Sequence, residues 1–518
     1  MRWTRWSCSK TISLTTKALW CFIAMALIAQ HASLLSAQGK SDKKDKQAEK
    51  PPLEDVWQIV FLGEQRVGYG RIVTRQEVNK GKPIIHTRNE LHFTLKRFGQ
   101  QIRMETLLQT EETLEGDLLR YDFEIRNPPA DPTISEGTIQ GNRLTVKSTV
   151  AGRVQTRSVP WEAGIKSPLY QDRSLQSNPL KPGEVRSYQT FLPELQKVAT
   201  LKLSAHDFQS VKLYDGKPSR LLKVQILNSA VPTMVVKSYL DENGESLKSE
   251  SDLLGMALTT YTVPREVALE EIKGSELDVA VGTLIPVTGF DKGHDSKKVV
   301  YRITAEDVDL MDYIPEGDSQ KVEIKSPGEV ELTVSRLPAP KSSINENVAD
   351  EFLKGSEFVQ IDDQLVREHA LKATAGESDQ WRKAVKLEKY IHEKLTEKNF
   401  STALASAAEV AKRMEGDCTE HAVLLAALLR VNKIPSRVAV GLVYAEGQQS
   451  FAGHMWTEAY FGNQWIPLDA TLGRGGIGGA HIKLADASLS DDSPAPVLTF
   501  LPLLNVLGKM KIEILEQD

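Results

Sequence analysis

The sequence predicts an α+β protein in which a large N-terminal antiparallel β domain precedes a small β module and a mixed α+β core. Short runs of alternating apolar and polar residues, such as RLTVKSTV (143–150), dominate residues 52–275. After about residue 346, apolar residues recur at helical spacing instead, as in DQWRKAVKLEKYIHEKL (379–395). The 518 residues, of which 41% are hydrophobic, can form about three domains with packed cores.

Residues 1–37 have the pattern of a secretory signal peptide. Basic residues precede the apolar run ALWCFIAMALIA (18–29), which small and polar residues follow. The run is too short to cross a bilayer, because a spanning helix needs about 20 apolar residues. We therefore expect cleavage near Ala37, export to the periplasm or the extracellular space, and no stable membrane span in the processed chain.

The charge of the chain gives no sign of a nucleic-acid partner. The formal net charge is −5, and the basic residues are not gathered into the cationic patch that nucleic-acid binding requires. We therefore expect no nucleic acid among the partners.

The rest of the chain divides into segments of different composition. Residues 38–51 are charged and end at prolines, which predicts a flexible linker. Within the β domain, Asp215-Gly216 and Asn243-Gly244 lie between strand patterns and predict two-residue hairpin turns. Beyond that domain we expect the small β module at 276–340, the α+β core at 346–490 and a C-terminal tail at 491–518.

Cysteine usage singles out one position. Cys8 and Cys21 lie inside the predicted signal peptide, so the processed chain would carry Cys418 alone and no internal disulfide. A lone thiol is a liability in an oxidising compartment, which favours a functional role. The alternative is a buried thiol that packs as a small hydrophobic residue.

The residues around Cys418 predict a helix that begins at the cysteine. Asp417 and Glu420, followed by AVLLAALLRV, form a capping-box pattern. A thiolate at the first helical position faces unpaired backbone N–H groups and the positive end of the helix dipole, which both lower the pKa of the thiol. We expect this helix to end at Asn432 in a left-handed cap, before Pro435.

Downstream, HMWTEAYF and QWIPLDAT predict a β-hairpin that turns on the dipeptide GN at 462–463. A two-residue loop pairs Phe461 with Gln464, so that His454 and Asp469 take diagonal positions on one face. Their Cα atoms would then be roughly 7–8 Å apart, which lets the carboxylate reach the imidazole.

Cys418, His454 and Asp469 together offer the groups of an activated nucleophile. The imidazole can take the thiol proton, the carboxylate can fix its tautomer, and the thiolate can attack a carbonyl carbon. The backbone N–H of Cys418 is a natural donor for an oxyanion hole. Each residue also has a purely structural alternative. Cys418 would be a thiol packed in the core, His454 a hydrogen-bonded histidine, and Asp469 an acid in the turn at the end of a strand.

The stretches GDCTEHAVLLAALLRVNKIPSRVAVGLVY and HMWTEAYFGNQWIPLDAT resemble the core of the transglutaminase-like superfamily, in its exported bacterial branch. The resemblance covers about residues 370–485 and rests on three motifs in order: Gly-x-Cys, His-x-Trp-x-Glu and Trp-x-x-x-Asp. It implies a papain-like core with a triad of Cys418, His454 and Asp469. The AHIKL segment (480–484) and Arg437 also match bacterial members and are interpreted as structural, whereas the glycine-rich GRGGIGG (473–479) departs from the family pattern.

The resemblance and the triad together predict an exported cysteine-dependent enzyme that transfers acyl groups from amide bonds. Hydrolysis by a protease or amidase and cross-linking by a transglutaminase both fit, and the substrate would be a protein, a peptide or a cell-wall peptide. The alternative is a non-catalytic envelope scaffold or peptide-binding protein that uses the same core for recognition.

A zinc site built from Cys418, His421, His454 and His481 is a further alternative, because C-x-x-H places two ligand types one helical turn apart. No second Cys pair supports a closed zinc site, and no oxygen-rich loop predicts calcium. We therefore predict neither a metal nor a cofactor. We interpret Trp456 and Trp465 as packing residues and Glu458 as a solvated or structural contact.

Overall fold

The computed structural model describes residues 52–97, 99–128, 130–150, 152–272, 277–306, 308–341, 348–397, 405–491 and 496–518. The predicted signal peptide (1–37), the charged linker (38–51) and the two cysteines Cys8 and Cys21 lie outside these ranges. Across the described ranges, every helix is too short or too polar to cross a membrane.

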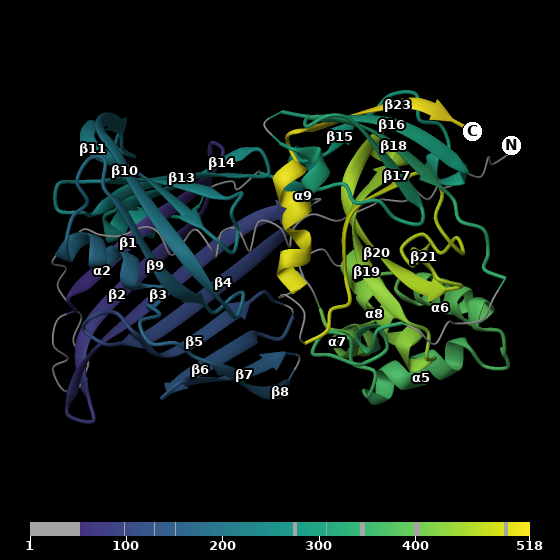
Figure 1. Cartoon of the computed structure of the whole chain (residues 1–518), viewed down its shortest axis with the longest axis horizontal. Helices are drawn as coiled ribbons and strands as arrows, with labels where there is room; N and C mark the ends of the chain where they lie inside the picture. Colours follow the sequence, from purple (N-terminus) through teal and green to yellow (C-terminus); the bar gives the residue numbers. More distant parts are fainter. Residues whose placement is uncertain are drawn as a thin grey trace, which may run out of the picture.

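The N-terminal part of the described chain is one antiparallel sheet of fourteen strands (Figure 1). Strands β1 to β8 form one meander and β9 to β14 a second, and β1 pairs with β14, so the two meanders join at the centre of the sheet and β8 and β9 are its edges. The strands are β1 (Glu54–Leu62), β2 (Gln65–Asn79), β3 (Lys82–Arg97), β4 (Gln100–Glu112), β5 (Leu118–Arg126), β6 (Thr133–Gln140), β7 (Arg143–Val150), β8 (Arg153–Pro160), β9 (Val185–Leu192), β10 (Lys197–Lys212), β11 (Pro218–Asn228), β12 (Val235–Leu240), β13 (Ser246–Leu253) and β14 (Met256–Val263). Three short helices accompany them: α2 (Tyr170–Ser177), α3 (Arg265–Ala268) and α4 (Val279–Gly282).

Alternation in the sequence explains why these segments form strands with one buried face. In β7 the residues alternate between exposed and buried almost without exception. The sheet is curled, so that its two edges approach each other. Leu144 of β7 and Phe191 of β9 lie near opposite edges, yet they share one hydrophobic cluster with Tyr121 of β5. The predicted antiparallel β architecture is therefore present.

The two predicted hairpin dipeptides do lie in hairpin connections, but the turns are longer than predicted. The connection from β10 to β11 runs from Leu213 to Lys217, and that from β12 to β13 runs from Asp241 to Glu245. Gly216 and Gly244 adopt φ angles of 77° and 82°, so glycine supplies the left-handed residue of each turn. The Asp241 carboxylate accepts the backbone N–H groups of Asn243 and Glu245, which stabilises the longer loop.

A second sheet joins the small β module to the end of the chain. Its strands, in spatial order, are β17 (Gln320–Ser326), β18 (Glu329–Ser335), β16 (Lys298–Ala305) and β23 (Met510–Gln517). β23 belongs to the segment that the sequence predicts only as a tail, and it pairs antiparallel with β16 through partners such as Ile303 and Ile512. The short 3-10 helices are η2 (Gly293–Asp295), η3 (Leu310–Asp312), η4 (Asp350–Phe352), η5 (Glu446–Gln448) and η6 (Pro496–Phe500).

The C-terminal core packs helices against a small antiparallel sheet. The helices are α5 (Gln364–Ala373), α6 (Gln380–Lys394), α7 (Ala407–Arg413) and α8 (Cys418–Val431), and the strands are β15 (Ile285–Pro286), β19 (Ser436–Ala445), β20 (Ser450–Phe461), β21 (Gln464–Leu468) and β22 (His481–Ala487). Helix α8 contacts β19 and β20 on one side and the other three helices on the other. Its side chains from Cys418 to Arg430 are all buried, so α8 is the central helix of the core.

The predicted left-handed cap at Asn432 is wrong. Asn432 has a φ of −83°, and the next residue, Lys433, takes the left-handed conformation with a φ of 60°. The Asn432 side chain instead donates to the carbonyl of Leu428 at 3.0 Å and accepts from the Thr374 hydroxyl at 3.2 Å. These contacts hold Asn432 in the last turn of the helix.

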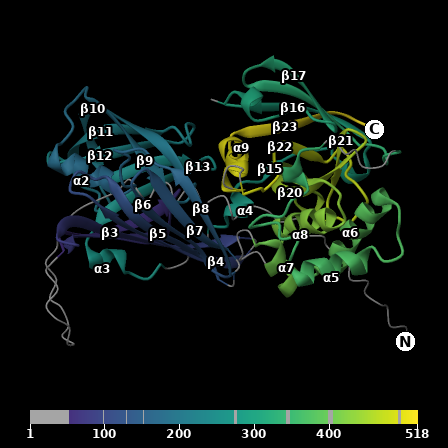
Figure 2. The same cartoon turned by 60° about the horizontal axis from the view of Figure 1, so that its bottom comes forward.

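The three sheets share one hydrophobic cluster, which includes Leu258 of β14, Ile303 of β16 and Val440 of β19. Helix α9 (Leu501–Val506) lies between the large sheet and the core in Figure 1 and again in Figure 2. Leu501 of this helix packs against the cluster that contains Leu192 of β9, and α9 also contacts β22. The end of the chain therefore packs between the two largest parts of the protein.

Candidate active site

Cys418 is the first residue of α8, as the sequence predicts. The Asp417 side chain accepts the backbone N–H of Thr419 at 2.8 Å, and the Glu420 carboxylate accepts the backbone N–H of Asp417 at 2.9 Å, which completes a capping box. Glu420 also accepts the backbone N–H of Ala405 at 3.0 Å. Cys418 is fully buried. It therefore lies in a rigid, capped first turn where the helix dipole favours a thiolate.

The buried groups beside Cys418 are held in uncharged forms. The Nδ1–H of His421 donates to the backbone oxygen of Asp417 at 2.5 Å, and burial lowers the pKa of His421 to about 4. Burial, reinforced by the nearby Asp417 carboxylate, raises the pKa of Glu420. A neutral His421 next to the thiol contributes orientation of the first turn rather than positive charge.

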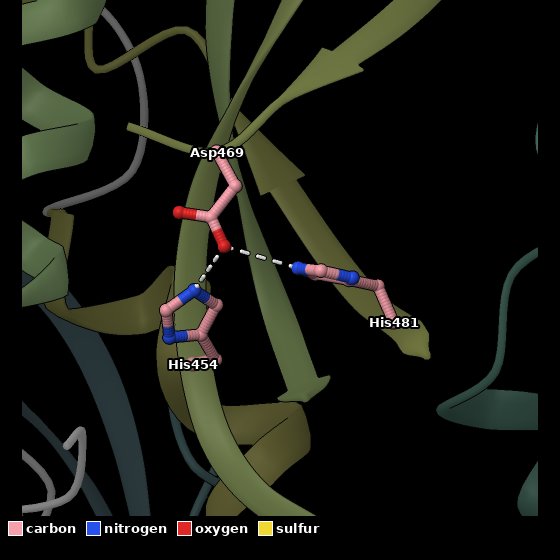
Figure 3. Close-up of side chains that lie close together, drawn as sticks. All are labelled: His454, Asp469 and His481. Carbon is pink, nitrogen blue, oxygen red and sulfur yellow. Dashed lines mark hydrogen bonds and ion pairs between the residues drawn. The ribbon is translucent and has the colours of Figure 1, made fainter. Parts of the chain in front are cut away.

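His454 and Asp469 are in direct contact. The predicted register is present: Phe461 of β20 pairs with Gln464 of β21. His454 is in β20, Asp469 follows the last residue of β21, and the Nε2–H of His454 donates to Asp469 Oδ2 at 2.8 Å (Figure 3). Both side chains are buried, with exposed fractions of 0% and 1%, so this hydrogen bond is shielded from solvent.

A second histidine reaches the same carboxylate oxygen. Figure 3 shows that His481, the first residue of β22, approaches Asp469 from a different direction than His454. Its Nε2–H donates to Asp469 Oδ2 at 3.1 Å, and its side chain is fully buried. The segment AHIKL (480–484) is predicted to be structural, and His481 is named only as a member of the alternative zinc set. The contact with Asp469 is not predicted, and the twelve residues between the two positions give no register from which it could be.

Both oxygens of the Asp469 carboxylate are engaged. Oδ1 accepts the backbone N–H of Thr471 at 2.8 Å, while Oδ2 takes the two imidazoles. Burial opposes ionisation of Asp469, but the charge and hydrogen bond of His454 and the hydrogen bond of His481 outweigh it. They hold the pKa of Asp469 well below its ordinary value. The carboxylate is therefore anionic and fixed in orientation.

Glu388 of α6 fixes the backbone around Asp469 and was missed in the sequence analysis. Its carboxylate accepts the backbone N–H of Asp469 at 2.9 Å, of Gly475 at 2.7 Å and of Gly476 at 3.5 Å. Gly475 and Gly476 have φ angles of 72° and 123°, which glycine adopts readily. The glycine-rich departure from the family pattern therefore lets this loop turn its amides toward one buried acid. A glutamate inside an amphipathic helix gives no signal for such a role.

Helix α8 and strand β20 hold the thiol and the imidazole on neighbouring elements. The Thr457 hydroxyl of β20 donates to the backbone oxygen of Ala422 in α8 at 2.9 Å. Thr457 lies three residues after His454, and Ala422 lies four residues after Cys418. The structure thus joins His454 to Asp469 directly and places Cys418 at the start of the helix that packs on the His454 strand.

The other residues of the His454 face have structural contacts. Trp456 stacks beside His454, with ring centroids 6.3 Å apart, and is almost fully buried. Glu458 is a buried carboxylate that pairs with Arg437 at 2.7 Å and with Lys483 at 3.2 Å. The guanidinium carbon of Arg437 lies over the Trp465 ring, 4.2 Å from the centroid of that ring. Packing and ion pairing therefore account for these side chains.

The zinc set considered from the sequence is only partly gathered. Among the described residues, the one group of three or more side chains whose ligand-type atoms lie within 4.8 Å of one another consists of His454, Asp469 and His481. Cys418 and His421 do not belong to it. The contacts inside this group are the two hydrogen bonds to Asp469 Oδ2.

A cleft of about 230 Å³ is lined in part by the loop that follows Asp469. Gly475 and Gly476, whose N–H groups donate to Glu388, form part of its wall. Its other lining residues are Arg336, Leu337, Pro338, Ala339, Trp381, Ile466, Pro467 and Ile477.

Comparison with known proteins assigns the core. Residues 367–470 match the family model of the transglutaminase-like superfamily. No curated protein matches the chain. This range begins in α5 and ends one residue after Asp469, so it contains Cys418, His454 and Asp469 but not His481.

Three solved structures show remote similarity. A candidate cysteine protease from Cytophaga hutchinsonii is 17% identical, with a TM-score of 0.27. The match covers 43% of this chain and 86% of that protein. A β-barrel-like protein of unknown function from Brucella abortus is 12% identical with a TM-score of 0.29, covering 40% and 96%. A candidate protease from Parabacteroides distasonis is 11% identical with a TM-score of 0.19, covering 72% and 69%.

The motif order, the helix that begins at Cys418 and the hydrogen-bonded His454–Asp469 pair agree with the family match. Residues 367–470 of this chain form a domain of the transglutaminase-like superfamily.

Proposed function

We propose that the protein is an exported thiol enzyme that transfers acyl groups from amide bonds. Cys418 is the nucleophile, His454 is the general base and acid, and Asp469 orients His454. The observation that carries the proposal is the 2.8 Å hydrogen bond between His454 Nε2 and Asp469 Oδ2 on the strand that packs against the Cys418 helix. Because Nε2 is committed to Asp469, Nδ1 is the nitrogen that exchanges a proton with the thiol.

In the proposed reaction His454 Nδ1 takes the Cys418 proton, and the sulfur attacks the carbonyl carbon of the amide. The C–N bond then breaks, and the proton passes from His454 to the departing amine, which leaves a thioester on Cys418. An acceptor gives its proton to His454 as it attacks the thioester, the C–S bond breaks, and His454 returns the proton to the sulfur of Cys418. The backbone N–H of Cys418, at the N-terminus of α8, is a donor for the developing oxyanion.

The acceptor separates two versions of this function. Water as acceptor makes the protein a protease or amidase, and an amine makes it a transglutaminase. The proposed substrate is a protein, a peptide or a cell-wall peptide, which fits the signal-peptide pattern at residues 1–37 and the export that it predicts.

The first test is the pH dependence of thiol labelling. Iodoacetamide modification of the peptide that contains Cys418 is followed by mass spectrometry in the wild type, in His454→Ala and in the control His206→Ala, an exposed histidine in β10. A Cys418 thiol activated by His454 should react up to about 100-fold faster at pH 6.5 than an ordinary thiol, which is only about 1% ionised there. His454→Ala should lose this advantage and His206→Ala should keep it. Equal rates in all three proteins would refute the proposal.

The second test identifies the reaction. The purified protein is incubated with mixed peptides and peptidoglycan fragments, and the products are read by mass, with Cys418→Ser as the inactive control. Addition of one water to a cleaved bond indicates hydrolysis, and release of ammonia with joining of two substrates indicates cross-linking.

A non-catalytic recognition role is the second candidate, and one observation favours it. The exposed fractions of Cys418, His454 and Asp469 are 0%, 1% and 1%, so a substrate cannot reach the sulfur without an opening of the structure. An enzyme must open to expose Cys418, whereas a scaffold need not. Unreactive Cys418, together with peptide binding that survives Cys418→Ser, would establish recognition without chemistry.

A further inference from the structure

The buried carboxylate of Asp469 serves two imidazoles, and the proposed function uses only one of them. His454 and His481 both donate through Nε2 to the same oxygen, Oδ2, at 2.8 and 3.1 Å. Two donors that share one oxygen divide its charge between them, and in a buried site no bulk water compensates for the loss of either one.

His481 is held as a neutral donor by its surroundings. A carboxylate oxygen only accepts, so the Nε2 of His481 carries the proton. Its Nδ1 is buried without a hydrogen-bond partner among the described residues, which makes a second proton at that nitrogen unfavourable. Burial likewise lowers the pKa of His481. His481 therefore donates one N–H to Asp469 without carrying positive charge.

The position of Asp469 does not depend on His481. The backbone N–H of Thr471 binds Oδ1 at 2.8 Å, and Glu388 holds the backbone N–H of Asp469 at 2.9 Å. Loss of the His481 donor would thus leave the carboxylate in place. Its charge at Oδ2 would then act on His454 alone.

We propose that His481 is a positioning residue that acts through Asp469: its N–H takes part of the charge at Oδ2 and so limits how strongly Asp469 stabilises the imidazolium form of His454. This inference rests on the proposed function, because it concerns the proton that His454 accepts from Cys418. It predicts that His481 sets the pH at which the thiolate forms, with no contact between His481 and the substrate.

Other charged or titratable groups face this cluster, and each has its own partner. Glu388 comes from α6, His421 from α8, His294 from η2, and Arg474 from the loop before β22. Arg474 pairs with Asp295 at 2.7 Å, and the Nε2–H of His294 donates to the backbone oxygen of Tyr444 at 2.9 Å. Because all four remain in every variant below, their contribution is common to each comparison.

The experiment measures the midpoint pH of iodoacetamide labelling at Cys418 in three variants. His481→Phe keeps a planar ring between Trp456 and His294 but has no N–H, whereas His481→Gln keeps an N–H donor. His206→Phe is the control for an exposed histidine. We expect His481→Phe to lower the midpoint by at least about half a pH unit, because the imidazolium is better stabilised. His481→Gln should stay within about 0.2 unit of the wild type, and His206→Phe should not change it.

Two results would overturn the inference. One is a His481→Phe protein that is folded by circular dichroism and has the wild-type midpoint or a higher one. The other needs no variant: nitrogen NMR of histidine-labelled wild-type protein should find His481 neutral, with the proton on Nε2, from pH 5 to pH 8. A doubly protonated His481 in that range contradicts the proposal even if His481→Phe does not fold.

Failure of the proposed function gives a different pattern. In that case wild-type Cys418 labels with the midpoint of an ordinary thiol, about 8.5, and His454→Ala changes nothing. Normal activation of Cys418 combined with a His481→Phe midpoint equal to that of the wild type would refute only the role of His481.

Discussion

Glu388 on α6 accepts the backbone N–H of Asp469 at 2.9 Å, across 81 residues of sequence. The same carboxylate accepts the N–H groups of Gly475 and Gly476, so one buried acid holds both sides of the loop that carries Asp469. The orientation of His454 therefore depends on helix α6, which acts on it through the loop that carries Asp469.

Replacing Glu388 by leucine should destabilise the protein strongly. One buried and two partly buried backbone N–H groups would lose their acceptor. A fully buried group that loses its acceptor costs about 1–3 kcal/mol, so we expect a total loss of about 3 kcal/mol in the free energy of unfolding at pH 6. Urea denaturation measures this loss. Glu393→Leu, on the exposed side of the same helix, is the matched control and should change stability by less than about 0.5 kcal/mol. Similar losses in both variants would contradict the role assigned to Glu388.

The stability of the protein should depend on the charge of Glu388. Burial, with the Asp469 charge, raises the pKa of Glu388 to about 8 in the folded protein, above the ordinary value of 4.5. The protonated form is thus favoured by folding, so this contribution is complete below about pH 4.5 and declines as the pH rises toward 8. Relative to Glu388→Gln, which cannot ionise, the wild type should lose up to about 1.4 kcal/mol per pH unit in this interval. Urea denaturation at several pH values checks the difference, and parallel curves would show that the pKa is not raised.

Removal of the Asp417 cap should affect both stability and thiol reactivity. Asp417→Ala deletes the acceptor for the first turn of α8, which should cost about 1 kcal/mol and let the turn that carries Cys418 fray. Asp363→Ala is the matched control, because Asp363 caps α5 through the N–H groups of Leu365 and Val366. Both variants should lose similar stability in urea denaturation, but only Asp417→Ala should slow iodoacetamide labelling of Cys418. Equal labelling rates would mean that the cap is purely structural.

The parts of the site that depend on local rules could be predicted from the sequence. A two-residue turn fixes the register between Phe461 and Gln464, and from that register the approach of Asp469 to His454 follows. A capping box is likewise complete within four residues, so the start of α8 at Cys418 is confirmed.

The parts that depend on long-range contacts could not be predicted in this way. His481 reaches Asp469 after a loop whose path no periodic pattern defines, and Glu388 reaches it from another helix. β23 pairs with β16 across about two hundred residues, although local sequence marks that segment only as the end of the chain. At Asn432, side-chain contacts with Thr374 and Leu428 replace the cap that local preference predicts.

Replacement of Glu458 shows whether this buried carboxylate on the His454 face stabilises the fold or takes part in the reaction. Its side chain is 2% exposed and pairs with Arg437 and Lys483, and both of these cations also pair with Asp486. Removing one partner of a buried pair costs about 3–5 kcal/mol when the remaining charge is left alone, and a second carboxylate reduces this cost. We therefore expect Glu458→Gln to lower the free energy of unfolding by up to about 3 kcal/mol.

The Arg302–Glu513 pair is the matched control for Glu458. It has the same 2.7 Å separation, but its side chains are 45% and 62% exposed. Glu513→Gln should change stability by less than about 1 kcal/mol, because water already solvates both charges. If Glu458 is structural, Cys418 in the folded fraction of Glu458→Gln should still label at the wild-type rate. Loss of labelling without loss of stability would instead place Glu458 in the chemistry of the site.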